Sequence, residues 1–291
     1  MASFATHFSG SVLLFPIALR RLLSSTSLFL QNPSNFRSKL WYFSNPNLKN
    51  LDLYALLIVL PIASFSHLFL FFSLSSHPAF TFSFFHQSLI LFAFWLLLLF
   101  IIAHNYLGRP LLNQSFLFLF AGVVFLMEYS NIGKGVSGLA ASVYALLGRL
   151  TLVCAAACIY LSFKPCAFFA EFLLSCGLVF KGTWVMQVGV SLYTDAFGVK
   201  GCQKIAFLDP LMESVDMHCD LDEDRLRGAA LMHLLFTVHA IVVMVLGVGV
   251  FGLVASNRGL RVGGEARGAL LGEIESASAR MQRAVPELEM E

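Results

Sequence analysis

The apolar residues of this chain occur in blocks of about 20, the length that crosses a hydrocarbon core of roughly 30 Å. The composition excludes a water-soluble globule, because 58% of the residues are hydrophobic and only 12% are charged, against about 25% charged residues in soluble domains. The 19 Lys and Arg nearly balance the 17 Asp and Glu, which argues against nucleic acid as a partner, since nucleic-acid recognition needs a concentrated basic face. The sequence therefore predicts an all-α, polytopic membrane protein, with the lipid bilayer as its predicted partner.

Seven apolar blocks predict a seven-transmembrane-helix bundle. The first block is the weakest, because it is short and because Arg20 and Arg21 close it. Its basic residues follow the apolar stretch, so cleavage as a signal peptide is not expected; an organellar transit peptide is the competing interpretation, since no acidic residue precedes Asp52. The predicted spans are residues 8–19, 51–74, 82–103, 114–130, 138–163, 167–193 and 228–255.

The orientation of the bundle follows from the basic residues in alternate loops, because short cytosolic loops retain Lys and Arg. The richer set is taken as cytosolic, which predicts a lumenal or external N-terminus and a cytosolic C-terminus. The expected membrane is that of the secretory pathway or the plasma membrane rather than an organellar one. That set comprises Arg20, Arg21, Arg37, Lys39, Lys49, Arg109, Lys164, Arg258, Arg261, Arg267, Arg280 and Arg283. The poorer set comprises Lys134, Lys200, Lys204, Arg225 and Arg227.

Two further segments complete the predicted organisation. Residues 1–257 form the membrane domain, which includes an acidic lumenal loop at 194–227, and residues 258–291 form a disordered cytosolic tail with mixed charges. Cys202 and Cys219 share the lumenal loop, where an oxidising compartment allows a disulfide. Two unpaired thiols are the alternative.

Ionisable residues inside the spans are candidates for function, because they are costly in lipid. Counted from the cytosolic ends at 1.5 Å per residue, Glu128 and Lys181 both lie roughly 21–23 Å up and are able to pair. Glu171 lies much nearer the cytosolic side and is not expected to reach Lys181. We predict a polar layer in the outer part of the bundle, formed by Glu128, Lys181, His86, Arg149, His233 and His239.

Two interpretations of this layer remain open. Either it is an ionic cluster that fixes the order of the helices, or it lines an outward-facing cavity for an ion, a proton or a small ligand. A membrane-embedded enzyme that uses Glu128 with a histidine is a further alternative, but the sequence contains no Gly-flanked serine elbow, paired His-Glu signature or phosphate loop. No metal or cofactor is predicted, because no two of these histidines have the i, i+3 or i, i+4 spacing of helical metal ligands.

The packing signals are plainer than the functional ones. Gly138, Ala141, Ala145 and Gly148 recur at three- and four-residue steps, which predicts a face on the fifth helix that a neighbour approaches closely. Trp184 on the sixth helix fits either an interfacial aromatic role or packing against Lys181. Protein partners are not identified by any motif.

Several of these residues resemble a known family. Lys181-Gly182-Thr183-Trp184, followed by Gln187, Gly189, Leu192 and Tyr193, resembles the sixth helix of the transmembrane protein 45 family, a domain of unknown function that is abundant in plants. The segment from Cys219-Asp220-Leu221 through Arg225-Leu226-Arg227-Gly228 to His239 is similar to the plant branch, and Glu128 and His86 also stand where that family has an acid and a histidine. The likeness extends to about residue 257 and is most specific over 177–254.

The resemblance has one departure and limited implications. Many members have several histidines after the fourth-helix glutamate, whereas residues 129–144 contain none here and Tyr144 stands at an expected histidine position. This departure counts against a metal or proton-relay role for that stretch. The family implies a seven-helix membrane protein without an established activity; some plant relatives are labelled with response to virus.

Overall fold

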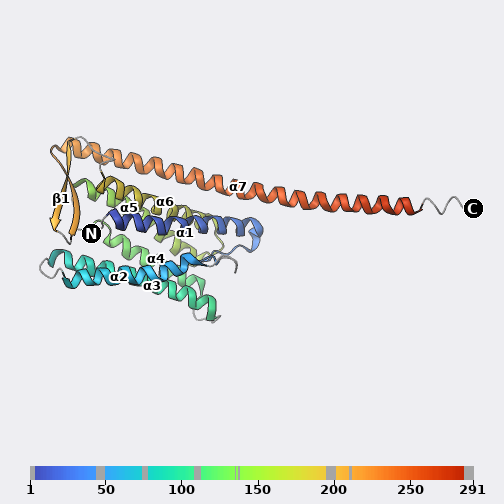
Figure 1. Cartoon of the computed structure of the whole chain (residues 1–291), viewed down its shortest axis with the longest axis horizontal. Helices are drawn as coiled ribbons and strands as arrows, with labels where there is room; N and C mark the ends of the chain where they lie inside the picture. The colour runs from blue at the N-terminus through green and yellow to red at the C-terminus, as the bar shows by residue number, and fades with distance from the viewer. Residues whose placement is uncertain are drawn as a thin grey trace, which may run out of the picture. The chain divides into compact units, whose positions relative to one another are not determined.

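A computed structural model describes residues 4–43, 50–73, 78–107, 113–134, 136, 138–194, 201–209 and 212–284. Over these residues the chain forms seven α-helices, one short 3-10 helix and a β-hairpin (Figure 1), so the predicted all-α architecture is confirmed and a hairpin is added to it. The elements are α1 (Phe4–Gln31), η1 (Pro33–Asn35), α2 (Leu51–Ser73), α3 (Pro78–Leu107), α4 (Gln114–Asn131), α5 (Gly138–Phe163), α6 (Phe168–Tyr193), β1 (Cys202–Asp209), β2 (Met212–Cys219) and α7 (Asp222–Ala284).

Six helical segments in the described part of the chain are long and apolar enough to cross a membrane, and they identify a membrane protein. They are Phe4–Gln31, Leu51–Ser73, Phe82–Asn105, Gly138–Phe163, Phe168–Tyr193 and Asp222–Asn257. Helix α4 is not among them: it has 18 residues, and polar residues occupy both of its ends.

Helix α1 differs from its predicted span. It continues for eleven residues beyond Arg20, to Gln31, instead of ending at the arginine pair. The continuation is possible because both arginines are compensated: Arg20 forms a 2.8 Å ion pair with Asp52, and Arg21 is paired inside the bundle. The prediction that these arginines close the first helix was wrong.

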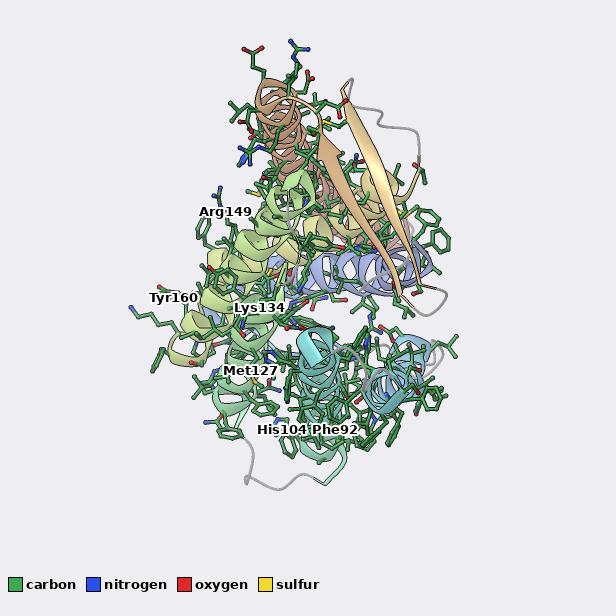
Figure 2. All side chains as sticks on the ribbon, turned by 90° about the vertical axis from the view of Figure 1, so that its left-hand side faces the viewer. Phe92, His104, Met127, Lys134, Arg149 and Tyr160 are labelled. Atoms are coloured by element: carbon green, nitrogen blue, oxygen red, sulfur yellow. A yellow bond between two sulfur atoms is a disulfide. The ribbon has the colours of Figure 1, made fainter. Side chains whose placement is uncertain are left out.

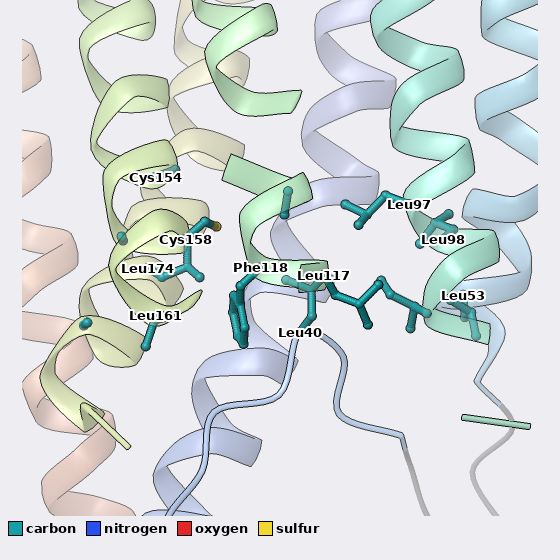
Figure 3. Close-up of a cluster of buried hydrophobic side chains, with 14 residues drawn as sticks. Leu40, Leu53, Leu97, Leu98, Leu117, Phe118, Cys154, Cys158, Leu161 and Leu174 are labelled. Atoms are coloured by element: carbon teal, nitrogen blue, oxygen red, sulfur yellow. The ribbon is translucent and has the colours of Figure 1, made fainter. Parts of the chain in front are cut away.

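Helices α5 and α6 form the centre of the bundle. Within their most apolar windows 61% of the residues are buried, against 6% in α2, which therefore lies at the periphery. Helix α6 packs against α1 on one side and α5 on the other, α5 packs against α4, and α2 pairs with α3. Figure 3 shows the apolar core where these elements meet, built around Leu117, Phe118, Cys154, Cys158 and Leu174.

Two glycines allow α1 and α6 to approach closely in antiparallel order. A Cβ added at Gly182 would lie 3.0 Å from the backbone nitrogen of Phe15, and one added at Gly189 would lie 2.8 Å from Cβ of His7. The predicted small-residue face of α5 is in part lined by a neighbour, since a Cβ at Gly148 would lie 3.4 Å from the Tyr129 ring.

The predicted acidic loop contains the hairpin, whose strands pair antiparallel from Cys202↔Cys219 to Asp209↔Met212. The hairpin lies at the end of the bundle where the N-terminus lies (Figure 1). The chain divides into two compact units, Met1–Gly247 and Val248–Glu291. Helix α7 continues to Ala284, over residues for which the sequence predicts a disordered tail; Ala, Leu, Glu and Arg are frequent there and are strong helix formers.

Candidate functional site

Lys181 and Glu128 form an ion pair between the middle of α6 and the last turn of α4. The Lys181 Nζ atom lies 2.5 Å from Oε2 of Glu128 and 4.9 Å from the centre of the Phe125 ring. The two side chains differ in accessibility, because 6% of the Lys181 side chain is exposed against 22% of the Glu128 side chain. The ammonium is therefore enclosed, and the carboxylate is the more exposed of the two partners.

Arg21 and Glu171 form a second and more deeply buried ion pair. The Nη2 atom of Arg21 lies 2.7 Å from Oε2 of Glu171, and the two side chains are 8% and 0% exposed. Nη1 of Arg21 donates a 2.6 Å hydrogen bond to the carbonyl oxygen of Leu40, and the guanidinium also lies over the rings of Tyr42 and Phe118. This pair joins α1 to α6 at the opposite end of the bundle from the hairpin.

Sequence reasoning missed the Arg21–Glu171 pair. It counted Arg21 among the loop residues, because a basic doublet after an apolar stretch is typical of a helix end. The available signal was Glu171, a carboxylate inside a span, which requires a partner of opposite charge. Only a cation on a neighbouring helix near the same end satisfies that requirement, and Arg21 is such a cation.

Tyr42 and Ser38 surround the second pair from the segment between α1 and α2. Burial, together with the neighbouring Glu171 carboxylate, raises the pKa of Tyr42, so its hydroxyl is neutral at physiological pH. Among the described atoms, Oε1 of Glu171, Nε of Arg21 and Oγ of Ser38 are buried without a hydrogen-bond partner. The pair is compensated in charge but incomplete in hydrogen bonding, which is costly in a buried position.

Histidines occupy two other positions against α6. The Nε2 atom of His7 lies 3.3 Å from the Tyr144 hydroxyl, and the His7 ring lies 5.5 Å from the Tyr193 ring. Near the middle of α6, Nε2 of His239 lies 2.8 Å from Oγ1 of Thr183. His7 was not predicted as a site residue, because it lies outside the predicted first span.

The structure brings together only part of the predicted polar layer. Glu128 and Lys181 are in contact, and His239 bonds a residue two positions from Lys181. Arg149 and His233 are exposed and His86 is half-buried, and none of the three forms an ion pair with any residue that the structure describes. Figure 2 shows Arg149 at the outer surface of α5, pointing away from the bundle.

Trp184 does not lie at an interface. Its side chain is fully buried, and its ring packs edge-on against Phe236 at 5.0 Å and against His239 at 5.9 Å. The interfacial role suggested for Trp184 is therefore wrong. Its indole instead fills the contact between α6 and α7.

Two of the six cysteines are bonded, and they are the pair in the loop between α6 and α7. Cys202 and Cys219 form a disulfide across the first register pair of the hairpin. Cys154, Cys158 and Cys176 are buried free thiols, whereas Cys166 is free and exposed in the turn between α5 and α6.

Two hollows on the described residues are lined by no member of either ion pair. One is an open apolar surface on α2 lined by Ile62, Phe65 and Phe69, and another lies between α1 and α6 beside Phe15 and Thr183. In the part of the chain that the structure describes, no group of three or more His, Cys, Asp or Glu is arranged to hold a metal ion.

One family model matches this chain. It is described as a family of unknown function (DUF716) and matches residues 109–252, a range that includes Glu128 and Lys181 but not Arg21. The match supports a DUF716-type family. No curated protein matches the chain.

Proposed function

We propose that this DUF716-type chain is an integral membrane protein with seven crossing helices that binds a proton or a small monovalent cation at Glu128 and passes it across the membrane. Lys181 acts in this proposal as the resident cation, which holds the carboxylate when the site is empty. The finer assignment to the plant branch of the transmembrane protein 45 family, its association with response to virus, and a location in the plasma membrane or secretory pathway belong to the same proposal.

The seven-span topology adds α4 to the six long apolar helices. At 1.5 Å per residue its 18 residues extend about 27 Å, close to the thickness of a hydrocarbon core, and α4 packs between α3 and α5. With seven crossings the N-terminus and the hairpin lie on one side of the membrane and the turn between α5 and α6 on the other. The distribution of positive charge, to which Lys164 contributes, supports the cytosol for this turn and the outside for the hairpin.

Cysteine labelling tests this topology. Cys166 is exposed between α5 and α6, and Lys134 is exposed between α4 and α5. In intact cells an impermeant maleimide should label Lys134→Cys in a Cys166→Ser background, whereas Cys166 of the unmodified chain should react only after permeabilisation. Labelling of both positions from the same side would mean that α5 does not cross, and the reverse pattern would invert the orientation.

One observation carries the cation site: the unequal enclosure of the two charges. Lys181 is almost sealed, so it cannot leave the protein interior, while the more accessible Glu128 carboxylate is able to exchange its partner. A carboxylate whose counter-charge is a buried ammonium binds an incoming cation only if that cation competes with the ammonium. Because of this competition, we expect the Glu128 site to bind small cations that lose their hydration shell in preference to cations that stay hydrated.

Reconstitution into proteoliposomes tests the site. We expect cation or proton uptake under an imposed potential by the unmodified chain, and at least a tenfold loss in Glu128→Gln. Arg149→Gln is the matched control, because it removes an exposed charge from the same bundle and should leave uptake unchanged. Uptake by the unmodified chain no greater than that of empty liposomes, or full uptake by Glu128→Gln, would refute the proposal.

The second candidate is a purely structural pair, and it is favoured by the position of the hollows. Neither of those described is lined by Glu128 or Lys181. The double variant Glu128→Gln/Lys181→Met separates the two functions, since it removes both charges at similar volume. If the double variant is as abundant as the unmodified chain but has lost uptake, the result supports the cation site. If it is as abundant and the cellular phenotype is unchanged, the result supports a structural role. The enzyme alternative gains no such support, because His239 is bonded to Thr183 rather than to Glu128.

A further inference from the structure

The segment between α1 and α2 contains a strap, residues 36–43, that lies across the end of the bundle opposite the hairpin. Every second side chain of the strap is buried: Phe36 is 2% exposed, Ser38 1%, Leu40 9% and Tyr42 9%. Between them, Arg37 and Lys39 are both exposed, whereas Trp41 is half-buried and packs against the apolar core. The alternation means that the strap attaches through one face and presents its basic residues on the other.

Hydrogen bonds hold the strap to two helices, α1 and α4, and to the turn between α5 and α6. The backbone nitrogen of Ser38 donates to the carbonyl oxygen of Pro165 at 2.8 Å, in the turn between α5 and α6. The backbone nitrogen of Leu40 donates to Oε1 of Gln114 at 3.2 Å, and its carbonyl oxygen accepts from Arg21. The strap is therefore fixed in place, and the positions of Arg37 and Lys39 are set by the fold.

The bond between Ser38 and Pro165 brings a third cation to the same place. Lys164 immediately precedes Pro165 and is exposed, so Arg37, Lys39 and Lys164 surround one backbone hydrogen bond. No described residue forms an ion pair with any of the three. The two acidic side chains described at this end are already engaged, Asp52 with Arg20 and Glu171 with Arg21.

Aromatic side chains accompany the three cations. Phe163 and Phe169 flank the turn that contains Lys164, and they are 76% and 75% exposed. The ring of Trp41 in the strap lies 5.2 Å from the Arg20 guanidinium carbon. Exposed aromatic rings beside cations at a helix end are typical of the membrane–water interface, where the cations meet lipid phosphates.

We infer that Arg37, Lys39 and Lys164 form a binding site for the headgroup of an anionic phospholipid in the cytosolic leaflet. The inference rests on the proposed orientation for the choice of leaflet, but not on the cation site at Glu128. Charge complementarity identifies the occupant: three cations without an acidic neighbour attract an anionic headgroup, while the adjacent phenylalanines contact its acyl chains. A soluble phosphate has the same charge but uses none of this apolar surface.

Binding of short-chain lipids to the full-length chain in detergent tests the inference. The probe is a short-chain phosphatidylinositol phosphate, compared with a short-chain phosphatidylcholine and with the free inositol phosphate headgroup. A basic residue at a membrane surface contributes about 1 kcal/mol, or roughly a fivefold change in affinity. The variant Arg37→Gln/Lys39→Gln/Lys164→Gln should therefore weaken binding of the anionic lipid by roughly 100-fold.

A matched variant controls for net charge. Lys134→Gln/Arg225→Gln/Arg227→Gln removes three exposed cations at the hairpin end and should leave the affinity within about twofold. Both triple variants should retain the thermal stability of the unmodified chain without lipid, because all six side chains are exposed and such substitutions usually change stability little.

Three results would overturn the inference. These are equal affinities for the anionic and zwitterionic lipids, an equal loss of affinity in both triple variants, and equally tight binding of the free headgroup, which would identify a site for soluble phosphate. The labelling of Cys166 is read separately. If Cys166 reacts from the outside while the strap variant still loses lipid binding, the proposed orientation fails and the headgroup site lies in the outer leaflet.

Discussion

Replacing Glu171 by Gln should destabilise the bundle more than any other conservative change at its two ion pairs. The Arg21 side chain is 8% exposed, and the substitution removes the one carboxylate that pairs with it among the described residues. Arginine cannot discard its charge. The remaining neighbours are the carbonyl oxygen of Leu40 and the rings of Tyr42 and Phe118. These groups accept a hydrogen bond or attract a cation, but none of them carries a full negative charge.

The magnitude follows from the burial of both partners. Removing one member of a buried ion pair typically costs about 3–5 kcal/mol, and the fully buried Glu171 places this variant at the upper end of that range. Arg21→Met should cost less, because a lone carboxylate can be neutralised by a proton, at no more than about 4 kcal/mol at neutral pH. The double variant removes both charges and loses mainly the hydrogen bond to Leu40, about 1 kcal/mol.

A double-mutant cycle on the purified full-length chain measures these values. Unfolding in detergent with increasing denaturant gives the free energy for Glu171→Gln, Arg21→Met and the double variant. Because the single changes should cost about 5 and up to about 4 kcal/mol and the double variant about 1 kcal/mol, the expected coupling energy is about 4–8 kcal/mol. Arg225→Met is the control, since it breaks a pair whose side chains are 55% and 88% exposed, and such pairs contribute about 0–1 kcal/mol. A double variant as unstable as the two single changes added together would refute the reasoning.

Three other predictions use single sites. Gly182→Ala should lower the free energy of unfolding by about 1–3 kcal/mol, because its Cβ would press on the backbone of α1. The control is Gly249→Ala, which has no described atom within 4 Å and should be neutral or stabilise by up to about 1 kcal/mol. Equal effects of the two changes would contradict the close packing of α1 on α6. Because burial raises the pKa of Tyr42, the absorbance difference between the unmodified chain and Tyr42→Phe should lack a phenolate band at about pH 11 when folded and show one when unfolded. Because the folded state favours the neutral phenol of Tyr42, its contribution to the free energy of unfolding is present below about pH 10 and is lost as the pH rises further. A phenolate band from Tyr42 in the folded protein at about pH 11 would contradict the raised pKa. Peptide mapping without reductant should recover Cys202 linked to Cys219, and two free thiols in the mature protein would exclude the bridge.

The sequence was informative where one residue type has one physical meaning. Long apolar blocks predicted membrane helices, because no other environment accepts them. The common depth of Glu128 and Lys181 made their contact foreseeable, because helical rise converts residue number into height. The sequence was uninformative about rotation around each helix axis, and rotation decides whether a charge faces the bundle. Arg149 and Lys181 have similar depth and similar chemistry, yet one is exposed on α5 and the other is buried on α6.

The polar residues of α6 explain how an apolar bundle acquires a unique register. Glu171 and Lys181 are ten residues apart, about 15 Å along the helix, and they bind partners from two different helices, α1 and α4. The transfer of leucine and phenylalanine side chains out of water contributes little to the register of a helix, because lipid tails are as apolar as the protein interior. A slide of one turn, about 5.4 Å, would break both ion pairs together and leave four charges unpaired in the bundle. The two pairs therefore fix α6 against α1 and α4, and of the two carboxylates only that of Glu128 is partly exposed.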